Sequence, residues 1–208
     1  MTEDWDIPLL ITLLFGKVFI SWMVFYFFHS FLLLKPIRDS IIEGFKSSPQ
    51  AYRIVYNLFS ALSLLLVLII QFEHQAAYQF AIPSSLKILA AAVLIFSIYM
   101  LKQSFKNYRL YVFIGLEKET QMAFSDSGLN AVIRHPLYSF SLLAFLSTAV
   151  ILPSSDSVQM FLAVVLYVQI GYRLEERKLI EVFGEPYREY QKAVPALLPS
   201  LFSKKSAV

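Results

Sequence analysis

The chain alternates between long apolar segments and shorter polar ones, and this pattern predicts membrane-spanning helices. The apolar segments are residues 7–34, 54–72, 82–101, 136–153 and 157–172. A helix needs about 20 apolar residues to cross the roughly 30 Å of hydrocarbon in a bilayer. We therefore expect the long first segment to tilt, and the short fifth one to continue beyond the membrane as one helix. The pattern predicts an all-α, polytopic membrane helical bundle of about five transmembrane helices in a single domain, residues 1–208.

Polar residues between these segments indicate where the helices begin and end. Ser154, followed by Ser155 and Asp156, is typical of a helix N-cap, so the fourth and fifth segments are expected to form a tight antiparallel hairpin. Gly184 is expected to end the extended fifth helix. Residues 101–113 are interpreted as a short helix at the membrane surface. The segment after residue 183 is interpreted as a short amphipathic helix followed by extended chain under the bundle.

The distribution of positive charge predicts the orientation in the membrane. All but two of the 18 Lys and Arg residues lie in three regions: 35–53, 102–134 and 173–208. Loops rich in Lys and Arg stay in the cytoplasm, so the N-terminus is expected outside and the C-terminus inside. Lys17, near the middle of the first segment, is expected to be paired or to extend toward the interface rather than to act in catalysis.

Composition excludes several functional classes. The chain has no cysteine, so it offers neither disulfides nor a thiolate nucleophile, and its three histidines lack the spacing of metal ligands. Its six glycines form no nucleotide-binding loop. The basic residues flank apolar segments, so we expect no nucleic-acid partner. The acidic first residues indicate no cleaved signal peptide.

Two groups of ionisable residues stand at the predicted cytoplasmic edge of the membrane, where such residues usually serve a function. The first is Arg134–Tyr138, sequence RHPLY, and the second is the pair Glu175 and Glu176. Pro136 suits the first turn of a helix, whose free amide groups and dipole attract an anion beside Arg134. The paired carboxylates attract an ammonium group. A ligand that carries both an amino and a carboxylate group is therefore predicted to fit between them.

The two groups also resemble a known family. RHPLY followed by EERKLIEVFGEPYREYQKAVPALLP, residues 175–199, resembles the integral membrane methyltransferases around isoprenylcysteine carboxyl methyltransferase. That group includes phospholipid N-methyltransferases and methanethiol S-methyltransferases, and the resemblance covers about residues 120–200. Upstream, His29-Ser30 and YRIVYNLFS, residues 52–60, are similar to methanethiol methyltransferases and to related accessory membrane proteins of nitrogen-oxide metabolism.

The resemblance implies S-adenosylmethionine as cofactor, held in a cytosolic pocket formed by the last two spans and the tail. The residues it assigns to cofactor binding are His135, Pro136, Leu137, Tyr138, Glu175, Asn130, Met122, Ala123, Phe124 and Ser125. Asn130 stands where relatives often have an aromatic residue. Arg173, Arg134 and His29 are the candidates for catalysis and acceptor placement. The implied acceptor is a small or lipid-borne thiol, carboxylate or amine, and the upstream resemblance favours a thiol.

Two alternatives remain open at this point. One is a membrane reductase of the sterol type that uses NADPH, because such proteins share a related Arg-His-x-x-Tyr element and hairpin. The other is a non-catalytic accessory protein of the same fold. His29 is either a hydrogen-bonded helix residue or a wall of the acceptor pocket. We expect an integral protein of the bacterial inner membrane, in contact with its lipids, with the site on the cytoplasmic face; the sequence does not indicate the oligomeric state.

Overall fold

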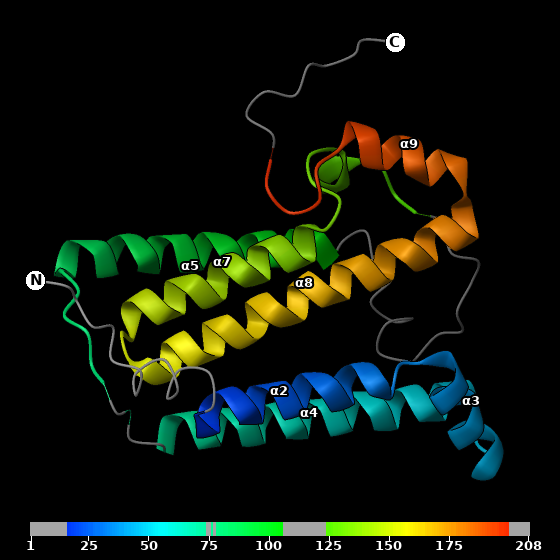
Figure 1. Cartoon of the computed structure of the whole chain (residues 1–208), viewed down its shortest axis with the longest axis horizontal. Coiled ribbons are helices and arrows are strands. Elements are labelled where there is room, and N and C mark those ends of the chain that lie inside the picture. Colours follow the sequence, from blue (N-terminus) through cyan, green and yellow to red (C-terminus); the bar gives the residue numbers. More distant parts are fainter. Residues whose placement is uncertain (1–15, 74–75, 77, 106–123, 200–208) are drawn as a thin grey trace, which may run out of the picture.

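The structure, a computed structural model, describes residues 16–73, 76, 78–105 and 124–199, and these form a bundle of seven α-helices without a strand (Figure 1). The elements are α2 (Lys17–Phe31), α3 (Lys35–Gly44), α4 (Pro49–Glu73), α5 (Ser84–Ser104), the 3₁₀ helix η2 (Gly128–Ala131), α7 (Pro136–Ile151), α8 (Ser155–Phe183) and α9 (Glu185–Ala193). The prediction of an all-α membrane bundle is confirmed. The orientation across the membrane stays a prediction.

The predicted spans correspond to helices wherever the structure describes them. By length and apolarity α4, α5 and α8 are able to cross a membrane, and α2 with α3 makes a fourth candidate if the pair counts as one span. The helix α7, at 16 residues, is shorter. Residues 7–15 of the predicted first span, and residues 106–113 of the predicted surface helix, lie outside the described residues. Lys17, expected near mid-membrane, is the exposed first residue of α2.

The segment after α2 is a helix where the sequence analysis expected a loop. The helix α3 begins at Lys35 with proline in its first turn and bends 70° away from α2. Proline there has no amide hydrogen to lose and its fixed φ suits a helix start, while the missing donor separates α3 from α2. The expectation of a loop was therefore wrong, because Pro36 acts here as a helix start.

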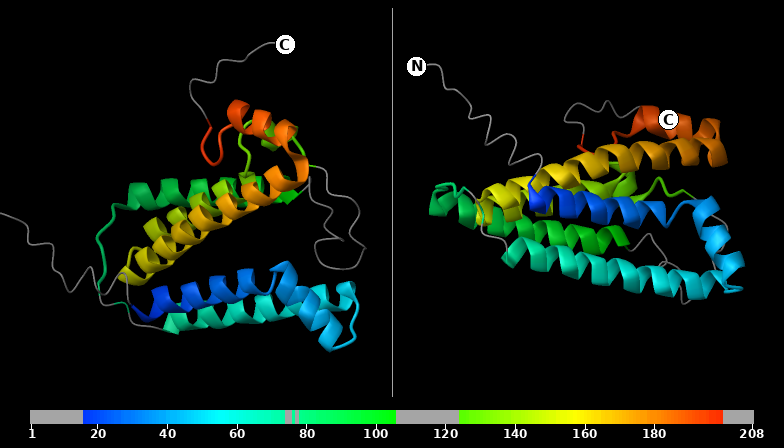
Figure 2. Two further views of the ribbon diagram at one scale, coloured as in Figure 1. Left: turned by 45° about the vertical axis from the view of Figure 1, so that its right-hand side comes forward. Right: turned by 60° about the horizontal axis from the view of Figure 1, so that its bottom comes forward.

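The helix α8 lies at the centre of the bundle (Figures 1 and 2). It packs against α7 on one side and α2 on the other, with α5 against α7 and α4 against α2. Residues Val18, Trp22 and Tyr26 recur every four positions and so share the face of α2 that packs in the core. Met160, Ala163, Val164 and Val168 supply the matching face of α8. Outward positions such as Val55 of α4 and Ile88 of α5 are 66% and 71% exposed, as expected for side chains that face lipid.

Polar side chains also join the helices inside the bundle. Trp22 Nε1 donates to Gln71 Oε1 at 2.8 Å, and the backbone amide of Phe19 donates to Gln159 Oε1 at 2.9 Å. These bonds tie α2 to α4 and to α8. Because lipid offers no competing hydrogen-bond partner, such contacts help to hold membrane helices together.

The predicted boundaries of α8 are confirmed. Ser154 caps its start by accepting a hydrogen bond from the amide of Ser157 at 3.2 Å. The helix then runs for 29 residues to Phe183 and ends at Gly184, whose φ is 63° and ψ −133°. The predicted amphipathic helix follows directly as α9. Gly184 therefore sets the direction in which α9 leaves α8.

We expect Gly184→Ala to lower the free energy of unfolding by about 1–3 kcal/mol, because residues with a Cβ rarely adopt this conformation. A Cβ at Gly184 would meet nothing within 4 Å, so backbone strain is the only source of the loss. Thermal unfolding in detergent measures it. Gly44→Ala is the matched control, since its Cβ would also stand in open space, and as a helical residue of α3 it should keep stability or raise it slightly. Equal stability of the two variants would contradict the prediction.

Candidate functional site

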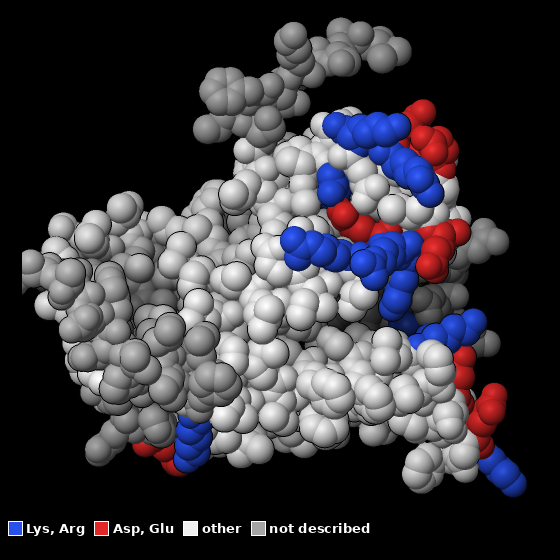
Figure 3. All heavy atoms as spheres, in the orientation of Figure 1, with Lys and Arg blue, Asp and Glu red and all other residues white. Residues whose placement is uncertain are grey.

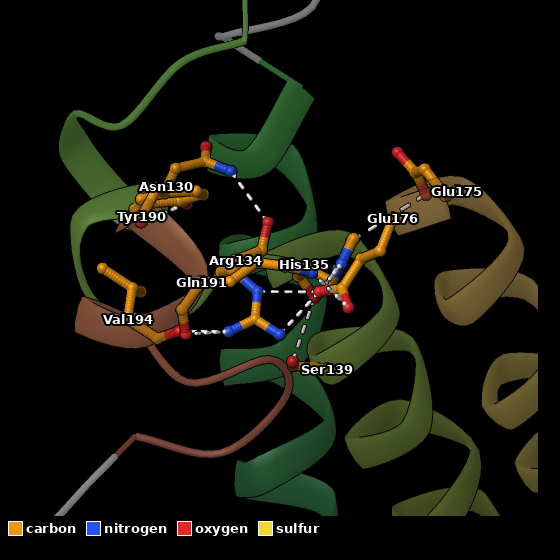
Figure 4. A network of polar contacts seen from close by, with 9 residues as sticks. All are labelled: Asn130, Arg134, His135, Ser139, Glu175, Glu176, Tyr190, Gln191 and Val194. Atoms are coloured by element: carbon orange, nitrogen blue, oxygen red, sulfur yellow. Dashed lines mark hydrogen bonds and ion pairs between the residues drawn. The ribbon is translucent and has the colours of Figure 1, made fainter. Parts of the chain in front are cut away.

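Charged side chains gather at one end of the bundle, where α3, the end of α8 and α9 lie (Figure 3). At this charged end the RHPLY sequence begins α7 directly beside the last turns of α8. Arg134 and His135 precede the helix, and Pro136 occupies its first turn, as predicted. The structure thus brings the two sequence groups, 134–138 and 175–176, into contact. Figure 4 shows the resulting network of polar contacts.

Glu176 is the centre of this network. Arg134 donates to its Oε1 from both Nε, at 2.7 Å, and Nη2, at 2.6 Å. His135 Nε2 lies 3.0 Å from the same oxygen, and Gln191 Nε2 donates to Oε2 at 3.0 Å. The side chains of Arg134 and Glu176 are only 10% and 12% exposed. The carboxylate therefore joins α7, α8 and α9 at one point.

The protonation state of Glu176 follows from these partners. It lies beyond the apolar part of α8, which ends near Tyr172. Burial would raise the pKa of this carboxyl, but hydrogen bonds from His135 and Arg134 and their charge outweigh burial and hold the pKa of Glu176 below its ordinary value. Because an ionised carboxylate only accepts hydrogen bonds, His135 Nε2 must carry a hydrogen and donate it.

His135 is buried between the two glutamates. Its imidazole side chain is 5% exposed, and Nδ1 lies 3.8 Å from Glu175 Oε2 on the side away from Glu176. Glu175 itself is 41% exposed. Adjacent helix residues point about 100° apart, so one carboxylate turns inward and the other stays accessible. Glu175 is thus the acidic group of this site that a soluble ligand is able to reach.

The chain after α9 is bound along the start of α7. The amide of Arg134 donates to Pro195 O at 2.8 Å, and that of His135 donates to Ala196 O at 3.0 Å. Ser139 Oγ donates to Leu197 O at 2.6 Å. The guanidinium of Arg134 also donates from Nη1 to the carbonyls of Gln191 and Val194. We call residues 194–197 the C-terminal strap.

The strap uses donors that the sequence analysis reserved for a ligand. The backbone amides of Arg134 and His135, expected to hold an anionic group, are bonded to the chain itself. Every nitrogen of the Arg134 guanidinium is likewise engaged with Glu176 or with carbonyls of the chain. Arg134 therefore holds the tail in place. What this arrangement presents to a ligand is His135 Nδ1 and the Glu175 carboxylate.

Residues 124–130 pack against α9. Asn130 Nδ2 donates to Arg134 O at 3.0 Å, while the backbone carbonyl of Asn130 accepts from Tyr190 Oη at 2.6 Å. The Phe124 ring packs between Phe183 and Tyr187, with centroids 5.0 and 5.4 Å away. Ser125 Oγ lies 3.1 Å from Ser127 Oγ at the surface. These contacts fix the segment beside the strap; Met122 and Ala123 lie outside the described residues.

The remaining predicted residues of α7 and α8 differ in where they point. Pro136 is buried, and the Tyr138 ring lies 5.7 Å from that of His135, with Leu137 between them in the chain. The Tyr138 hydroxyl reaches α8 at Gly171, where an added Cβ would lie 3.4 Å from it. Arg173 is exposed, and its guanidinium lies over the Tyr172 ring, 5.0 Å from the centroid. Arg173 thus extends along the outer surface of α8.

His29 belongs to a second polar cluster, between α2 and α4. Its Nδ1 lies 2.9 Å from Tyr56 Oη and 3.3 Å from Ser60 Oγ. The two segments that resemble methanethiol methyltransferases, His29-Ser30 and residues 52–60, therefore lie next to each other in the structure. On α8 the ring of Tyr167 lies 6.5 Å from that of His29. The two polar clusters flank the same helix.

The sequence analysis predicted extended chain under the bundle after the amphipathic helix, but it missed Glu176 as the centre of the site, Gln191, and the hydrogen bonds of the strap. It had favoured Glu175 of the two glutamates as the functional one, and the structure gives Glu176 a structural position instead. Paired carboxylates next to a predicted helix end were the available signal, because neighbouring helix residues point about 100° apart and one of the two is able to turn inward. The strap lies within the motif of residues 175–199, but no residue type in it indicates which backbone carbonyls accept hydrogen bonds.

Comparison with known proteins adds a family and several relatives. A family profile described as NnrU protein matches residues 18–201. Methanethiol S-methyltransferase of Pseudomonas deceptionensis is 40% identical over 84 residues, which cover 40% of this chain and 31% of that protein. Methanethiol S-methyltransferase 2 of Bradyrhizobium diazoefficiens is 34% identical over 110 residues, 53% of this chain and 39% of that protein.

A longer match is less similar. Methanethiol S-methyltransferase of Crocosphaera subtropica is 27% identical over 164 residues, 73% of this chain and 62% of that protein. The chain thus spans less than two thirds of the length of each of these relatives. No solved structure matches it. The matches confirm the predicted resemblance to membrane methyltransferases.

Proposed function

The chain belongs to the NnrU protein family, and we propose that it is a membrane methyltransferase that uses S-adenosylmethionine. The acceptor in this proposal is a small or lipid-borne thiol, carboxylate or amine. Relatives named methanethiol S-methyltransferase favour a thiol among these. The proposed site is on the cytoplasmic face of a multi-pass membrane protein.

One observation carries the proposal: His135 is buried at the start of α7 with its Nδ1 directed at a partly exposed glutamate. The buried side is fixed, because Glu176 accepts the Nε2 hydrogen at 3.0 Å. The accessible side pairs an imidazole nitrogen with the Glu175 carboxylate. A positively charged amino group suits Glu175, and a carboxylate suits the protonated form of the imidazole, whose Nδ1 then donates to it. The amino-acid part of S-adenosylmethionine carries both.

The division of labour among the other residues follows from their contacts. S-adenosylmethionine, when bound, supplies an activated methyl group that a nucleophile takes in one displacement, without a metal or a covalent enzyme intermediate. The contribution of the protein is to align the reactants and to exclude water. Arg134 and Glu176 position His135 and the strap. Asn130 and Phe124 hold the adjoining segment against α9, and Arg173 at the surface of α8 is the candidate that meets an acceptor.

Calorimetric binding of S-adenosylhomocysteine to the detergent-purified protein tests the proposal. We expect a dissociation constant in the micromolar range and a loss of at least tenfold in affinity for His135→Ala, about 1.4 kcal/mol or more. Ser63→Ala is the control, because its hydroxyl donates to Phe59 O within the same helix, α4. It should bind like the wild type.

The alternatives predict different results in the same experiment. Folded protein that ignores S-adenosylhomocysteine but is stabilised by NADPH would be a reductase. Protein that binds S-adenosylhomocysteine yet methylates none of a panel of thiols, carboxylates and amines would be a non-catalytic accessory protein. Either result would overturn the proposed activity.

A further inference from the structure

The cluster around His29 is the second group of ionisable and hydrogen-bonding side chains that the structure joins across helices. Tyr56 Oη lies within 3.3 Å of both ring nitrogens of His29 and 3.1 Å from the carbonyl oxygen of the same residue. Ser60 Oγ completes the contacts at 3.3 Å from Nδ1. Tyr56 is only 7% exposed. The imidazole is therefore held by two hydroxyl groups of α4.

The cluster shares a face of α8 with the proposed cofactor site. Tyr167, Gly171 and Glu175 recur every four residues, so they follow one another along that face. Gly171 has no side chain, and the nearest atom to a Cβ placed there would be the Tyr138 hydroxyl at 3.4 Å. Tyr138 of α7 thus packs against Gly171, and the face runs from the carboxylate at Glu175, past this contact, to the ring of Tyr167 near His29.

Aromatic rings surround the imidazole of His29. The ring of Phe25 is stacked on His29 with centroids 5.6 Å apart, and Tyr26 stacks on Tyr167 at 4.1 Å. The titratable groups that face the imidazole from the packed helices are Tyr56 of α4 and Tyr167 of α8. Glu175 stands two turns further along α8.

The two hydroxyl partners allow the imidazole to change its protonation state in place. A hydroxyl is able to donate to a bare ring nitrogen or to accept from a protonated one. With the Tyr56 hydrogen directed to the carbonyl oxygen of His29, the Tyr56 and Ser60 oxygens accept N–H groups of the ring. Neither form of the imidazole is left without partners, which is the property a base needs in a setting poor in water.

We propose that His29, held by Tyr56 and Ser60, is the base that takes the proton from a small thiol acceptor bound between α2, α4 and α8. This inference rests on the proposed function. In the step the S–H bond breaks, its electron pair stays on sulfur as the nucleophile, and the proton joins a ring nitrogen of His29. The proton passes to water after the sulfur has been methylated. A carboxylate acceptor would need no such base, so the inference removes the carboxylate from the acceptor classes.

His29→Gln and Tyr56→Phe test this role in the full-length protein, with Ser63→Ala of the same helix as control. The acceptor probe is ethanethiol, and turnover is followed by the thioether in the headspace. We expect kcat of His29→Gln to fall by about 10²-fold or more, with a smaller fall for Tyr56→Phe. The rate of His29→Gln should rise with pH toward the pKa of the free thiol, because solution then supplies the thiolate.

A second readout does not depend on turnover. The chain has no cysteine, so thiolate ultraviolet absorbance in the complex with S-adenosylhomocysteine and ethanethiol reports only the bound acceptor. At neutral pH the wild type and Ser63→Ala should show it, and His29→Gln should not. S-adenosylhomocysteine affinity should stay within twofold in all variants.

The outcomes separate this inference from the proposed function. A wild type that does not bind S-adenosylhomocysteine overturns both. A wild type that methylates ethanethiol while His29→Gln keeps its kcat, or shows the same thiolate signal, overturns the role of His29 alone. A rise in KM without a change in kcat also overturns it, because it assigns His29 to binding rather than to proton transfer.

Discussion

Arg134→Gln is expected to destabilise the protein by about 3–5 kcal/mol, the usual cost of removing one partner from a buried ion pair. The substitution leaves Glu176 without its two strongest donors and frees the carbonyls of Gln191 and Val194. The strap then loses its side-chain anchor, and binding of S-adenosylhomocysteine should be lost with it. Thermal unfolding and hydrogen exchange of residues 191–197 measure the two effects.

The comparison with lysine separates charge from geometry. Arg134→Lys keeps the charge, but a single ammonium is unable to contact Glu176 through two nitrogens and two backbone carbonyls as well. We expect it to recover only part of the stability. Arg177→Gln, on the exposed face of α8, is the control and should change stability little. If Arg134→Gln unfolded at the temperature of this control, the anchoring role would be refuted.

The two neighbouring glutamates are expected to respond in opposite ways to loss of charge. Glu175→Gln should weaken S-adenosylhomocysteine binding at least tenfold, about 1.4 kcal/mol or more, and leave thermal stability nearly unchanged, because Glu175 is accessible. Glu176→Gln should lower stability, since it leaves the guanidinium of Arg134 buried without a countercharge. Calorimetry and thermal unfolding on the same preparations measure both.

Lowering the pH tests the different roles assigned to Glu175 and Glu176. The pKa of Glu176 is lowered in the folded protein, so its stabilising contribution is present at neutral pH and is lost as the pH falls below about 4.5 through that lowered pKa. The stability gap between the wild type and Glu176→Gln should therefore close in acid. A gap of constant size, or a loss of affinity confined to Glu176→Gln, would contradict the assignment of the two residues.

The sequence predicted the helices well, because hydrophobic pattern and local chemistry decide them. The boundaries of α8 depend on Ser154 and Gly184, whose capping roles are properties of the residues themselves. The contact of residues 134–138 with 175–176 was also predictable, because the short link between α7 and α8 forces an antiparallel hairpin. The helix α3 was missed because a proline is compatible both with a break between helices and with the first turn of a new helix.

The details of the site were beyond the reach of sequence patterns. The choice of Glu176 over Glu175 as the inward carboxylate depends on the rotation of α8 about its axis, which the packing of Ala163 and Val168 against α2 sets. The engagement of Arg134 by carbonyls depends on the path of the chain after α9. Every residue has a backbone carbonyl, so no residue type in the strap indicates that its carbonyls bind the start of α7.

The strap has a consequence for biosynthesis. The two segments that meet at His135 are separated by some sixty residues. The later segment, which contains Pro195 and Ala196, leaves the ribosome after the last span has been made. Helices that are already in the bilayer thus wait with the amides of residues 134 and 135 unpaired. We infer that membrane insertion and completion of this polar network are separate events, and that quality control has an interval in which a fully inserted chain still lacks the bound strap.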